Sequence, residues 1–313
     1  MQCICTNQEF QSSVTQCVTR NCTVTDALGT YLIQKPLDPH MLTGVFEATK
    51  NASLSSCNAP IRAHGQGYMV LSWAMIILAA IFVMIRFAFK IFEHHDLGED
   101  DWAVLATLCS AIACHAVSLG TIHQGLGRDL WTLRPKQITQ MLLLFEILAV
   151  LYFTALMLLK LSMVFFYIKV FTTPRAARLL WGTALFTFIW GVVYIIVATF
   201  QCQPISYFWN KWDGMHKGRC LDINAITTSN AAISIALDLW SLGIPLWQLW
   251  GLNMHWKRKI GVALMFGVGT FVTIVSILRL QALVNFAKSN NVSWEFYGVS
   301  RWSTIEIGVG TIW

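Results

Sequence analysis

The sequence predicts an all-α membrane protein: a seven-transmembrane helix bundle, with its seventh helix truncated, carrying a small cysteine-rich extracellular head. Of 313 residues, 56% are hydrophobic and only 12% are charged, whereas ordinary soluble domains carry about 25% charged residues. Apolar runs long enough to cross a bilayer recur along the chain, and five of nine cysteines fall in its polar first 65 residues. This composition excludes a typical soluble enzyme. The net charge of +6 is spread along the chain, so no nucleic-acid partner is expected.

The head, residues 1–64, has a cysteine density typical of disulfide-bonded domains in an oxidising, extracytoplasmic compartment. A zinc site is the alternative, but Cys3 and Cys5 are separated by a single residue and no histidine lies at zinc-finger spacing. No signal segment follows Met1, so we expect the head to be incomplete. With two cysteines of a later loop, the candidate disulfide cysteines are Cys3, Cys5, Cys17, Cys22, Cys57, Cys202 and Cys220.

The transmembrane region, residues 65–313, contains runs of the ~20 mostly apolar residues that a spanning helix needs. We expect the first six spans at Tyr68–Phe92, Trp102–Ile122, Ile138–Ile168, Leu179–Phe200, Ile223–Leu252 and Ile260–Leu278. A seventh apolar segment begins at Trp302 and reaches Trp313. Twelve helical residues extend about 18 Å, less than the ~30 Å hydrocarbon core. We therefore expect a truncated seventh span, with a short re-entrant or surface segment as the alternative.

The orientation is predicted from glycosylation sites and disulfides. The count of basic residues barely decides it, because an outside N-terminus places seven Lys or Arg residues in the inner loops and eight in the outer loops. With the N-terminus outside, the sequons and all cysteines outside the apolar runs share the outer face, where both modifications belong. The glycosylation candidates are Asn51 and Asn291; the sequon at Asn21 is weaker because Cys22 is its middle residue. We expect a multi-pass plasma-membrane protein with an extracellular N-terminus.

Four charged residues inside the spans are candidates for a ligand pocket, since each such charge costs roughly 2.5–3.5 kcal/mol to insert. Glu146, Arg279 and Glu306 are expected to meet in an outer cavity, with Arg279 paired to one carboxylate. A structural ion pair between helices is the alternative. Asp238 lies near mid-membrane, seven residues before Pro245. That proline would bend the helix, either as a hinge or as a static kink.

At the inner face we expect a switch formed by Asp100, Asp101 and Lys160, with the lysine paired to the aspartates. The alternative is that Lys160 extends to the headgroups and the aspartates favour the start of their helix. Basic residues of the inner loops would dock a cytosolic transducer or anchor anionic lipid; they are Lys169, Arg175, Arg178, Lys257, Arg258 and Lys259.

Two further patterns concern a disulfide and a metal. Cys202 and Cys220 bracket a polar outer loop, and a disulfide between them would stiffen its aromatic residues, which we expect to form an interface belt. These are Tyr207, Trp209 and Trp212. His115 and His123 share a helix face but lack carboxylate or cysteine partners at ligand spacing, so no metal site is expected.

In the head, Cys3-x-Cys5 is followed after eleven residues by Cys17 and after four more by Cys22. This spacing resembles the second half of the CFEM domain of fungal membrane proteins. Cys57 then follows after 34 residues, an excess of 19 over the family pattern, so residues 31–49 are predicted to be an insertion or a retained intron. Haem binding is not expected, because half of the domain is missing, including the aspartate before the Cys-x-Cys.

The spans, from about residue 65 to the end, contain a set of short motifs: Gly98–Trp102, Lys160–Ser162, Cys202–Ile205 through Cys220, Leu237–Asp238 with Ile244–Pro245, Lys257–Lys259 and Ser276–Leu280. In this order they resemble the fungal rhodopsin-domain family of seven-helix, G-protein-coupled-receptor-like membrane proteins. The resemblance implies a fungal cell-surface receptor for an unknown extracellular ligand. It also implies a heterotrimeric G protein as partner at the inner loops.

Three other functions are alternatives to the receptor. A transporter or channel is the main alternative, although only one helix break, at Pro245, is visible and no repeat is found. A retinal-binding protein needs a lysine, and residues 298–313 contain none. An enzyme is not expected, because the sequence shows no metal cluster, nucleophile elbow or phosphate loop. We therefore expect neither catalytic residues nor a cofactor.

Overall fold

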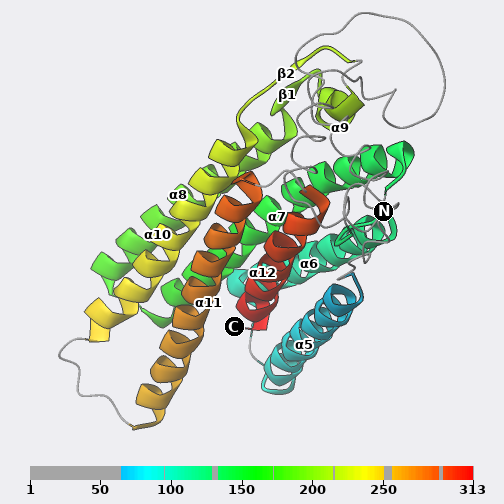
Figure 1. The fold of residues 1–313 in the computed structure, drawn as a ribbon. Coiled ribbons are helices and arrows are strands. Elements are labelled where there is room, and N and C mark those ends of the chain that lie inside the picture. Colours follow the sequence, from blue (N-terminus) through cyan, green and yellow to red (C-terminus); the bar gives the residue numbers. More distant parts are fainter. Residues whose placement is uncertain are drawn as a thin grey trace, which may run out of the picture.

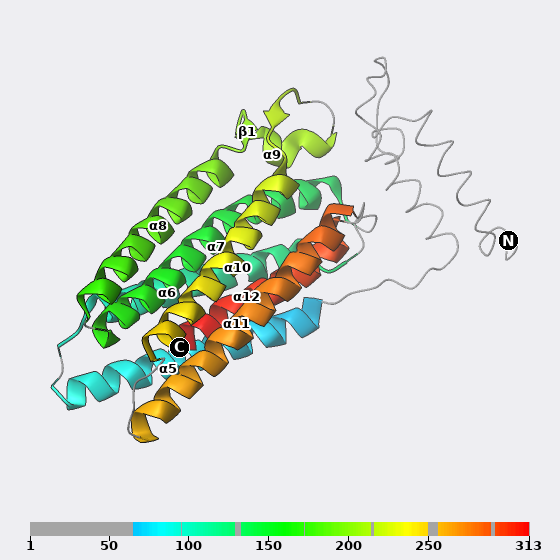
Figure 2. The same ribbon diagram turned by 90° about the vertical axis from the view of Figure 1, so that its left-hand side faces the viewer.

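A computed structural model describes residues 65–312 except 95, 129–132, 172, 214–215, 250–255 and 289–291. Within that part, seven long helices run alongside one another in an elongated bundle (Figures 1 and 2). They are α5 (Gly65–Phe92), α6 (Glu99–His123), α7 (Pro135–Val170), α8 (Pro174–Thr199), α10 (Ile223–Leu249), α11 (Trp256–Lys288) and α12 (Val292–Ile312). The head, with its five cysteines, Asn51 and residues 31–49, lies outside the described residues, as does Asn291.

The helices pack in chain order and the ring closes where α12 returns against α5. Helix α7 also contacts α12, so it lies towards the middle of the bundle (Figure 1). Helices α5, α7, α10 and α12 begin at one end, which also carries the loop after α8; we call it the disulfide end. The opposite end, where α6, α8 and α11 begin, is the far end.

Local sequence explains where several helices begin. Pro135 and Pro174 occupy the first helical positions of α7 and α8, where proline fits because its missing N–H would be unpaired there anyway. The start of α6 is acidic, and the Asp101 carboxylate accepts a hydrogen bond of 2.9 Å from the Gly98 backbone N–H. Negative charge at this position also favours the helix dipole.

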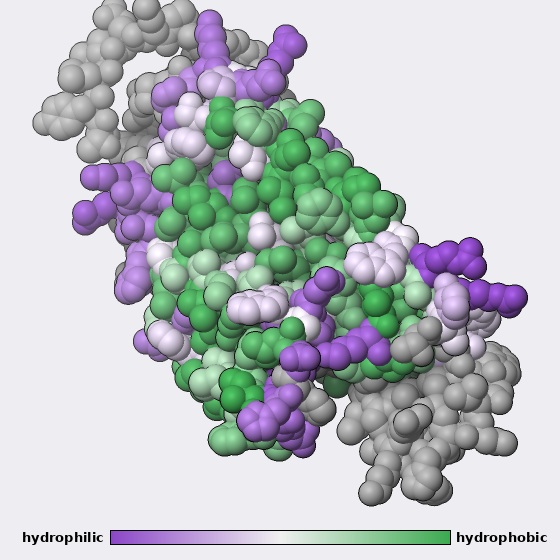
Figure 3. Space-filling view, turned by 180° about the vertical axis from the view of Figure 1, so that it is seen from behind, coloured by the Kyte–Doolittle hydropathy of each residue, from purple (hydrophilic) through white to green (hydrophobic). Residues whose placement is uncertain are grey.

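The face of the bundle seen in Figure 3 is mainly apolar along its middle. On α8 the exposed large apolar side chains are Trp181, Leu185, Phe186, Phe188, Ile189, Val193 and Ile196. A patch of this extent is incompatible with water and fits hydrocarbon. Among the helices of the described residues, six are long and apolar enough to span a membrane. The described chain is therefore a multi-pass helical membrane protein, as the composition predicted.

The core of the bundle is built around α7. Leu156, Leu159 and Met163 on this helix are almost fully buried. Helix α8 approaches closely at Gly191, where an added Cβ would lie 2.6 Å from Met157 Cβ. Such close contact leaves no space for a side chain at this position. Pro245 is buried and lies within α10, which continues past it to Leu249.

The seventh helix differs from the prediction. It begins at Val292, not Trp302, and has 21 residues, which gives a length of about 31 Å. Its first half escaped the hydropathy pattern because Glu295 and Arg301 interrupt the apolar run. Both are partly buried, and the Arg301 guanidinium lies 4.9 Å from the centre of the Trp302 ring.

The loop after α8 folds into a two-stranded hairpin, β1 (Cys202–Gln203) and β2 (Arg219–Cys220), with α9 (Tyr207–Asn210) and a short 3-10 turn, Lys211–Asp213, between them. The predicted disulfide between Cys202 and Cys220 is confirmed. The loop is fastened to α7, since Trp212 Nε1 donates to Thr139 Oγ1 at 2.9 Å. The role of the loop aromatics as an interface belt stays a prediction.

Candidate functional site

A chain of buried polar side chains crosses the middle of the bundle. It begins at Lys160 on α7, whose Nζ donates to Asp238 Oδ1 of α10 at 2.6 Å and to the Ser234 carbonyl at 3.1 Å. Both charged side chains are about 5% exposed. A buried charge persists only with a partner of opposite sign and satisfied hydrogen bonds. This pair therefore fixes α7 against α10.

Ser276 of α11 continues the chain between two carboxylates. Its Oγ lies 3.1 Å from Asp238 Oδ2 and 2.7 Å from Glu306 Oε1 of α12. A hydroxyl has one proton, so it can donate to only one carboxylate at a time. The shorter distance favours Glu306. Ser276 thus couples α10, α11 and α12 through one group.

Arg279 completes the chain, one helical turn from Ser276. Its Nε lies 3.3 Å from Glu306 Oε2, and its guanidinium carbon lies 5.0 Å from the centre of the Tyr152 ring. The Tyr152 hydroxyl donates to the same Glu306 oxygen at 2.6 Å. Arg279 is only 1% exposed. We call Lys160, Asp238, Ser276, Glu306, Arg279 and Tyr152 the polar core.

The net charge of the polar core is zero when its two basic and two acidic side chains are all ionised. Two cations, Lys160 and Arg279, face two anions, Asp238 and Glu306. Removing one member would leave a charge of a single sign in a low-dielectric interior, which is far more costly than the intact set. The arrangement therefore specifies the packing of α7, α10, α11 and α12 together.

A cavity of about 130 Å³ lies beside the polar core. We call it the bundle cavity; side chains from α5, α6, α7, α10, α11 and α12 line it. Arg279 and Tyr152 belong to both the cavity wall and the polar core. A cavity between helices, mostly apolar with a few convergent polar groups, is the usual form of a small-molecule site in a bundle. An occupant would touch the groups that hold four helices together.

Sequence reasoning missed most of the cavity wall. Ser72 of α5 and Nδ1 of His115 on α6 lie 2.5 Å apart, and Ser300 of α12 adds a buried hydroxyl. The available signal was small polar residues and a histidine inside otherwise apolar runs. The sequence placed His115 and His123 on one helix face, where no metal site was expected, and indicated no other role for His115. In the described residues, no group of three or more His, Cys, Asp or Glu side chains is placed to hold a metal.

Of the four ligand-pocket candidates, three belong to the polar core and Glu146 does not. Arg279 and Glu306 pair as expected, and Asp238 joins them through Ser276. The predicted position is corrected: Arg279 lies nine residues before the end of α11 and Glu306 fourteen after the start of α12, so the pair lies in the middle of the bundle and not in an outer cavity. Glu146 instead accepts a hydrogen bond from Gln201 Nε2 at 2.5 Å. Six residues separate it from Tyr152, which turns it about 120° away around the helix axis. The ligand role of all four residues stays a prediction.

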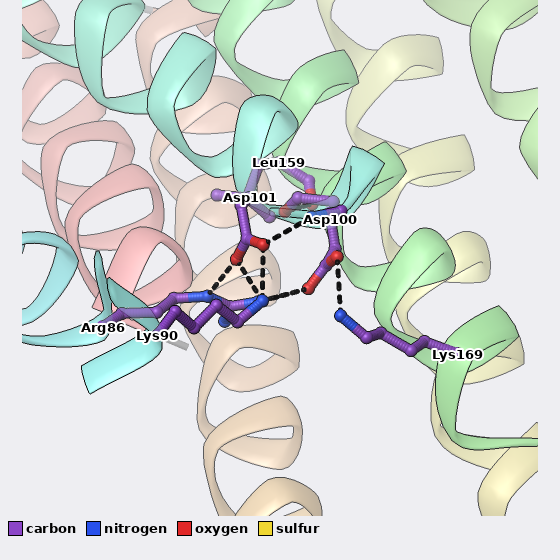
Figure 4. Close-up of polar contacts among 8 residues, drawn as sticks. Arg86, Lys90, Asp100, Asp101, Leu159 and Lys169 are labelled. Atoms are coloured by element: carbon purple, nitrogen blue, oxygen red, sulfur yellow. Dashed lines mark hydrogen bonds and ion pairs between the residues drawn. The ribbon is translucent and has the colours of Figure 1, made fainter. Parts of the chain in front are cut away.

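The expected inner switch is also corrected. Lys160 binds Asp238, and the two aspartates bind other cations (Figure 4). The Arg86 guanidinium lies 2.7 Å from Asp100 and 3.1 Å from Asp101. Two lysines complete this far-end cluster: Lys90 lies 2.5 Å from Asp101 and Lys169 lies 3.7 Å from Asp100.

The depth of Lys160 along α7 explains why it does not reach Asp100 and Asp101. Lys160 lies nine residues before Lys169 on α7, about 13 Å nearer the middle of the bundle. Lys160 is therefore too deep to reach the far end. The basic loop residues Lys257, Arg258 and Lys259 lie outside the residues whose side chains are described.

Comparison with known proteins agrees with this architecture. A family model for the fungal rhodopsin domain matches residues 85–313, and one for the CFEM domain matches residues 1–36. A SAT4 family membrane protein of Emericella nidulans is 28% identical over 58% of this chain and 47% of its own length. Fugralins biosynthesis cluster protein 2 of Gibberella zeae is 23% identical over 58% of this chain and 46% of its own length.

A third relative, the polyenoic acids biosynthesis gene cluster protein Ba17b of Metarhizium anisopliae, is 24% identical over 74% of this chain and 66% of its own length. The chain spans about half the length of the first two relatives. No solved structure shows a significant match. Because the rhodopsin-domain match covers most of the chain and the described helices form the expected bundle, the protein belongs to the fungal rhodopsin domain family.

Proposed function

We propose that this protein is a receptor-like sensor of the fungal plasma membrane, without enzymatic activity, whose bundle cavity takes a small molecule. The observation that supports it is that Arg279 and Tyr152 line the cavity and also belong to the polar core. A ligand that contacts them changes the relative stability of helix arrangements. Such differential binding is what shifts a conformational equilibrium.

The far end is the proposed output surface. With the N-terminus outside, this end faces the cytosol, and its cluster joins the ends of α5, α6 and α7 through ion pairs. A heterotrimeric G protein is the proposed transducer. The names of two relatives place them in biosynthesis gene clusters, and a sensor of a small fungal product would be in keeping with that setting.

A transporter or channel is the second candidate. Its support is the set of buried charges in mid-bundle, because intramembrane ionisable groups often mark ion or proton pathways. The two functions differ in what crosses the membrane. In proteoliposomes with an imposed potential, a transporter or channel would carry protons or ions, whereas a sensor would carry none.

The test of the sensor is nucleotide exchange on a purified heterotrimeric G protein by the full chain in lipid nanodiscs. We expect faster exchange than with empty nanodiscs. The Arg279→Ala variant should change the exchange rate, and Arg128→Ala should not, because Arg128 is exposed at the disulfide end. Correct surface delivery of both variants is checked in cells. Exchange no faster than with empty nanodiscs would contradict the proposal.

A further inference from the structure

Unpaired polar atoms gather at the bundle cavity. In the described part of the chain, seven buried side-chain nitrogen or oxygen atoms lack a hydrogen-bond partner. Four of them belong to cavity-lining residues: His115 Nε2, Ser300 Oγ, and Nε and Nη2 of Arg279. The Arg279 Nε is within ion-pair distance of Glu306 without hydrogen-bond alignment. Native proteins rarely bury such groups unpaired, so these atoms need a partner that the side chains around them do not supply, either water or a ligand.

The chemistry of these atoms restricts the ligand. Arginine nitrogens can only donate hydrogen bonds, and the serine hydroxyl and imidazole nitrogen can donate as well. The matching ligand group is therefore an acceptor oxygen. Arg279, Ser300 and His115 lie on α11, α12 and α6, so one oxygen-bearing ligand would contact three helices.

The rest of the cavity wall sets the size and polarity of the ligand. It is mainly apolar, with Met75, Ile76, Leu148, Phe296 and Ile307 among its residues. The volume of about 130 Å³ is close to that of an engineered cavity of roughly 150 Å³ that binds benzene. A ligand with a compact apolar body of about six to ten non-hydrogen atoms would fill it.

Charge decides between a neutral ligand and an anion. The positive charge of Arg279 is already balanced by Glu306, and Lys160 is balanced by Asp238. A carboxylate entering beside them would add an unbalanced negative charge to a buried site, with a desolvation cost that hydrogen bonds do not repay. A neutral acceptor satisfies the same donors without that cost.

We propose that the bundle cavity binds a small uncharged molecule with an apolar body and a carbonyl-type acceptor oxygen, such as a ketone, ester or lactone, held by Arg279 and Ser300. The proposal rests on the sensor function for its biological meaning. Binding itself is a separate property of the purified protein and is measured without any transducer.

Three probes with equal numbers of non-hydrogen atoms separate the ligand classes: acetophenone (neutral acceptor), cumene (no acceptor) and benzoate (anion). Dissociation constants are measured by calorimetry on the full chain in nanodiscs, with protein-free nanodiscs correcting for partition into lipid. We expect acetophenone to bind roughly tenfold more tightly than cumene, the effect of one good hydrogen bond, and benzoate to bind most weakly.

Two serine variants provide the matched test. Ser300 and Ser234 both carry a buried hydroxyl without a partner, but only Ser300 lines the cavity. Ser300→Ala should abolish most of the preference for acetophenone over cumene, and Ser234→Ala should keep it. Neither variant should lower the melting temperature of the free protein, because each removes an unpaired buried hydroxyl.

Equal binding of acetophenone and cumene, tightest binding of benzoate, or the same loss of preference in both serine variants would overturn the proposal. Acetophenone binding without any effect on nucleotide exchange would instead contradict the sensor function and leave the ligand class standing. Exchange stimulated by the chain with no acetophenone binding would contradict the ligand class alone.

Discussion

The pair of Lys160 and Asp238 gives the sharpest stability prediction. The Lys160→Met variant keeps a long flexible side chain in α7 and removes its charge. Asp238 then remains 5% exposed, without its contact of 2.6 Å to a cation. It keeps the hydrogen bond from Ser276 only when that hydroxyl does not donate to Glu306. The polar core changes from neutral to singly negative.

The size of the effect follows from that distance and burial. At 2.6 Å, two unit charges attract by about 6 kcal/mol at an effective dielectric constant of ~20. Relaxation around the orphaned aspartate recovers part of this, and breaking a buried pair costs about 3–5 kcal/mol in practice. The double variant Lys160→Met/Asp238→Asn has no orphaned charge, so we expect it to lose no more than about 2 kcal/mol.

The assay is the free energy of unfolding of the purified chain, titrated with SDS in mixed micelles. The two single variants and the double variant form a double-mutant cycle, and we expect a coupling energy of at least about 2 kcal/mol. Additive losses, or a loss below about 1 kcal/mol in Lys160→Met, would mean that the two side chains do not form a buried pair.

Three further predictions use the same unfolding assay. Gly191→Ala should lower the free energy of unfolding by about 1–3 kcal/mol, because its Cβ would clash with Met157. Gly182→Ala is the control: it lies on the same helix, nothing lies within 4 Å of its Cβ position, and it should be neutral or stabilising. Equal effects of the two variants would contradict the close α7–α8 contact. Asp101→Asn should lower the free energy of unfolding by about 1.5–3 kcal/mol, because the buried carboxylate gives up its charge-assisted hydrogen bonds to the partly exposed Arg86 and Lys90; a loss below about 0.5 kcal/mol would show a solvated surface pair. Cys220→Ser should lose about 2–4 kcal/mol, and unchanged stability in non-reducing buffer would show that the disulfide is absent.

The sequence was sufficient to predict the class of fold, because lipid as solvent imposes long apolar helices that composition reveals directly. The six predicted spans overlap the six long apolar helices, and the Cys202–Cys220 disulfide is found as predicted. Helix α11 continues ten residues past the predicted end at Leu278. The start of α12 was missed because Glu295 and Arg301 interrupt its apolar run. Hydropathy alone cannot distinguish the end of a helix from a helix that continues through polar residues which the fold partly buries.

The site was predictable only in part, because pairing depends on rotation about helix axes and on depth. Arg279 and Glu306 meet as expected, since each is costly to bury alone. Glu146 points elsewhere, and Lys160 lies too deep to reach the far-end aspartates. Arg86 and Lys90 belong to the far-end cluster, but nothing in the apolar run that contains them indicates which carboxylates they contact.

The most direct test of a ligand site within this bundle uses two natural cysteines of α6. The free thiol of Cys114 is buried and lines the bundle cavity, whereas the free thiol of Cys109 is exposed. Modification of both by methyl methanethiosulfonate is followed by mass spectrometry, with and without acetophenone. At ten times its dissociation constant, acetophenone should slow modification of Cys114 roughly tenfold, because about one protein in eleven remains free. Modification of Cys109 should not change. An unchanged rate at Cys114 would contradict the presence of a small-molecule site between these helices.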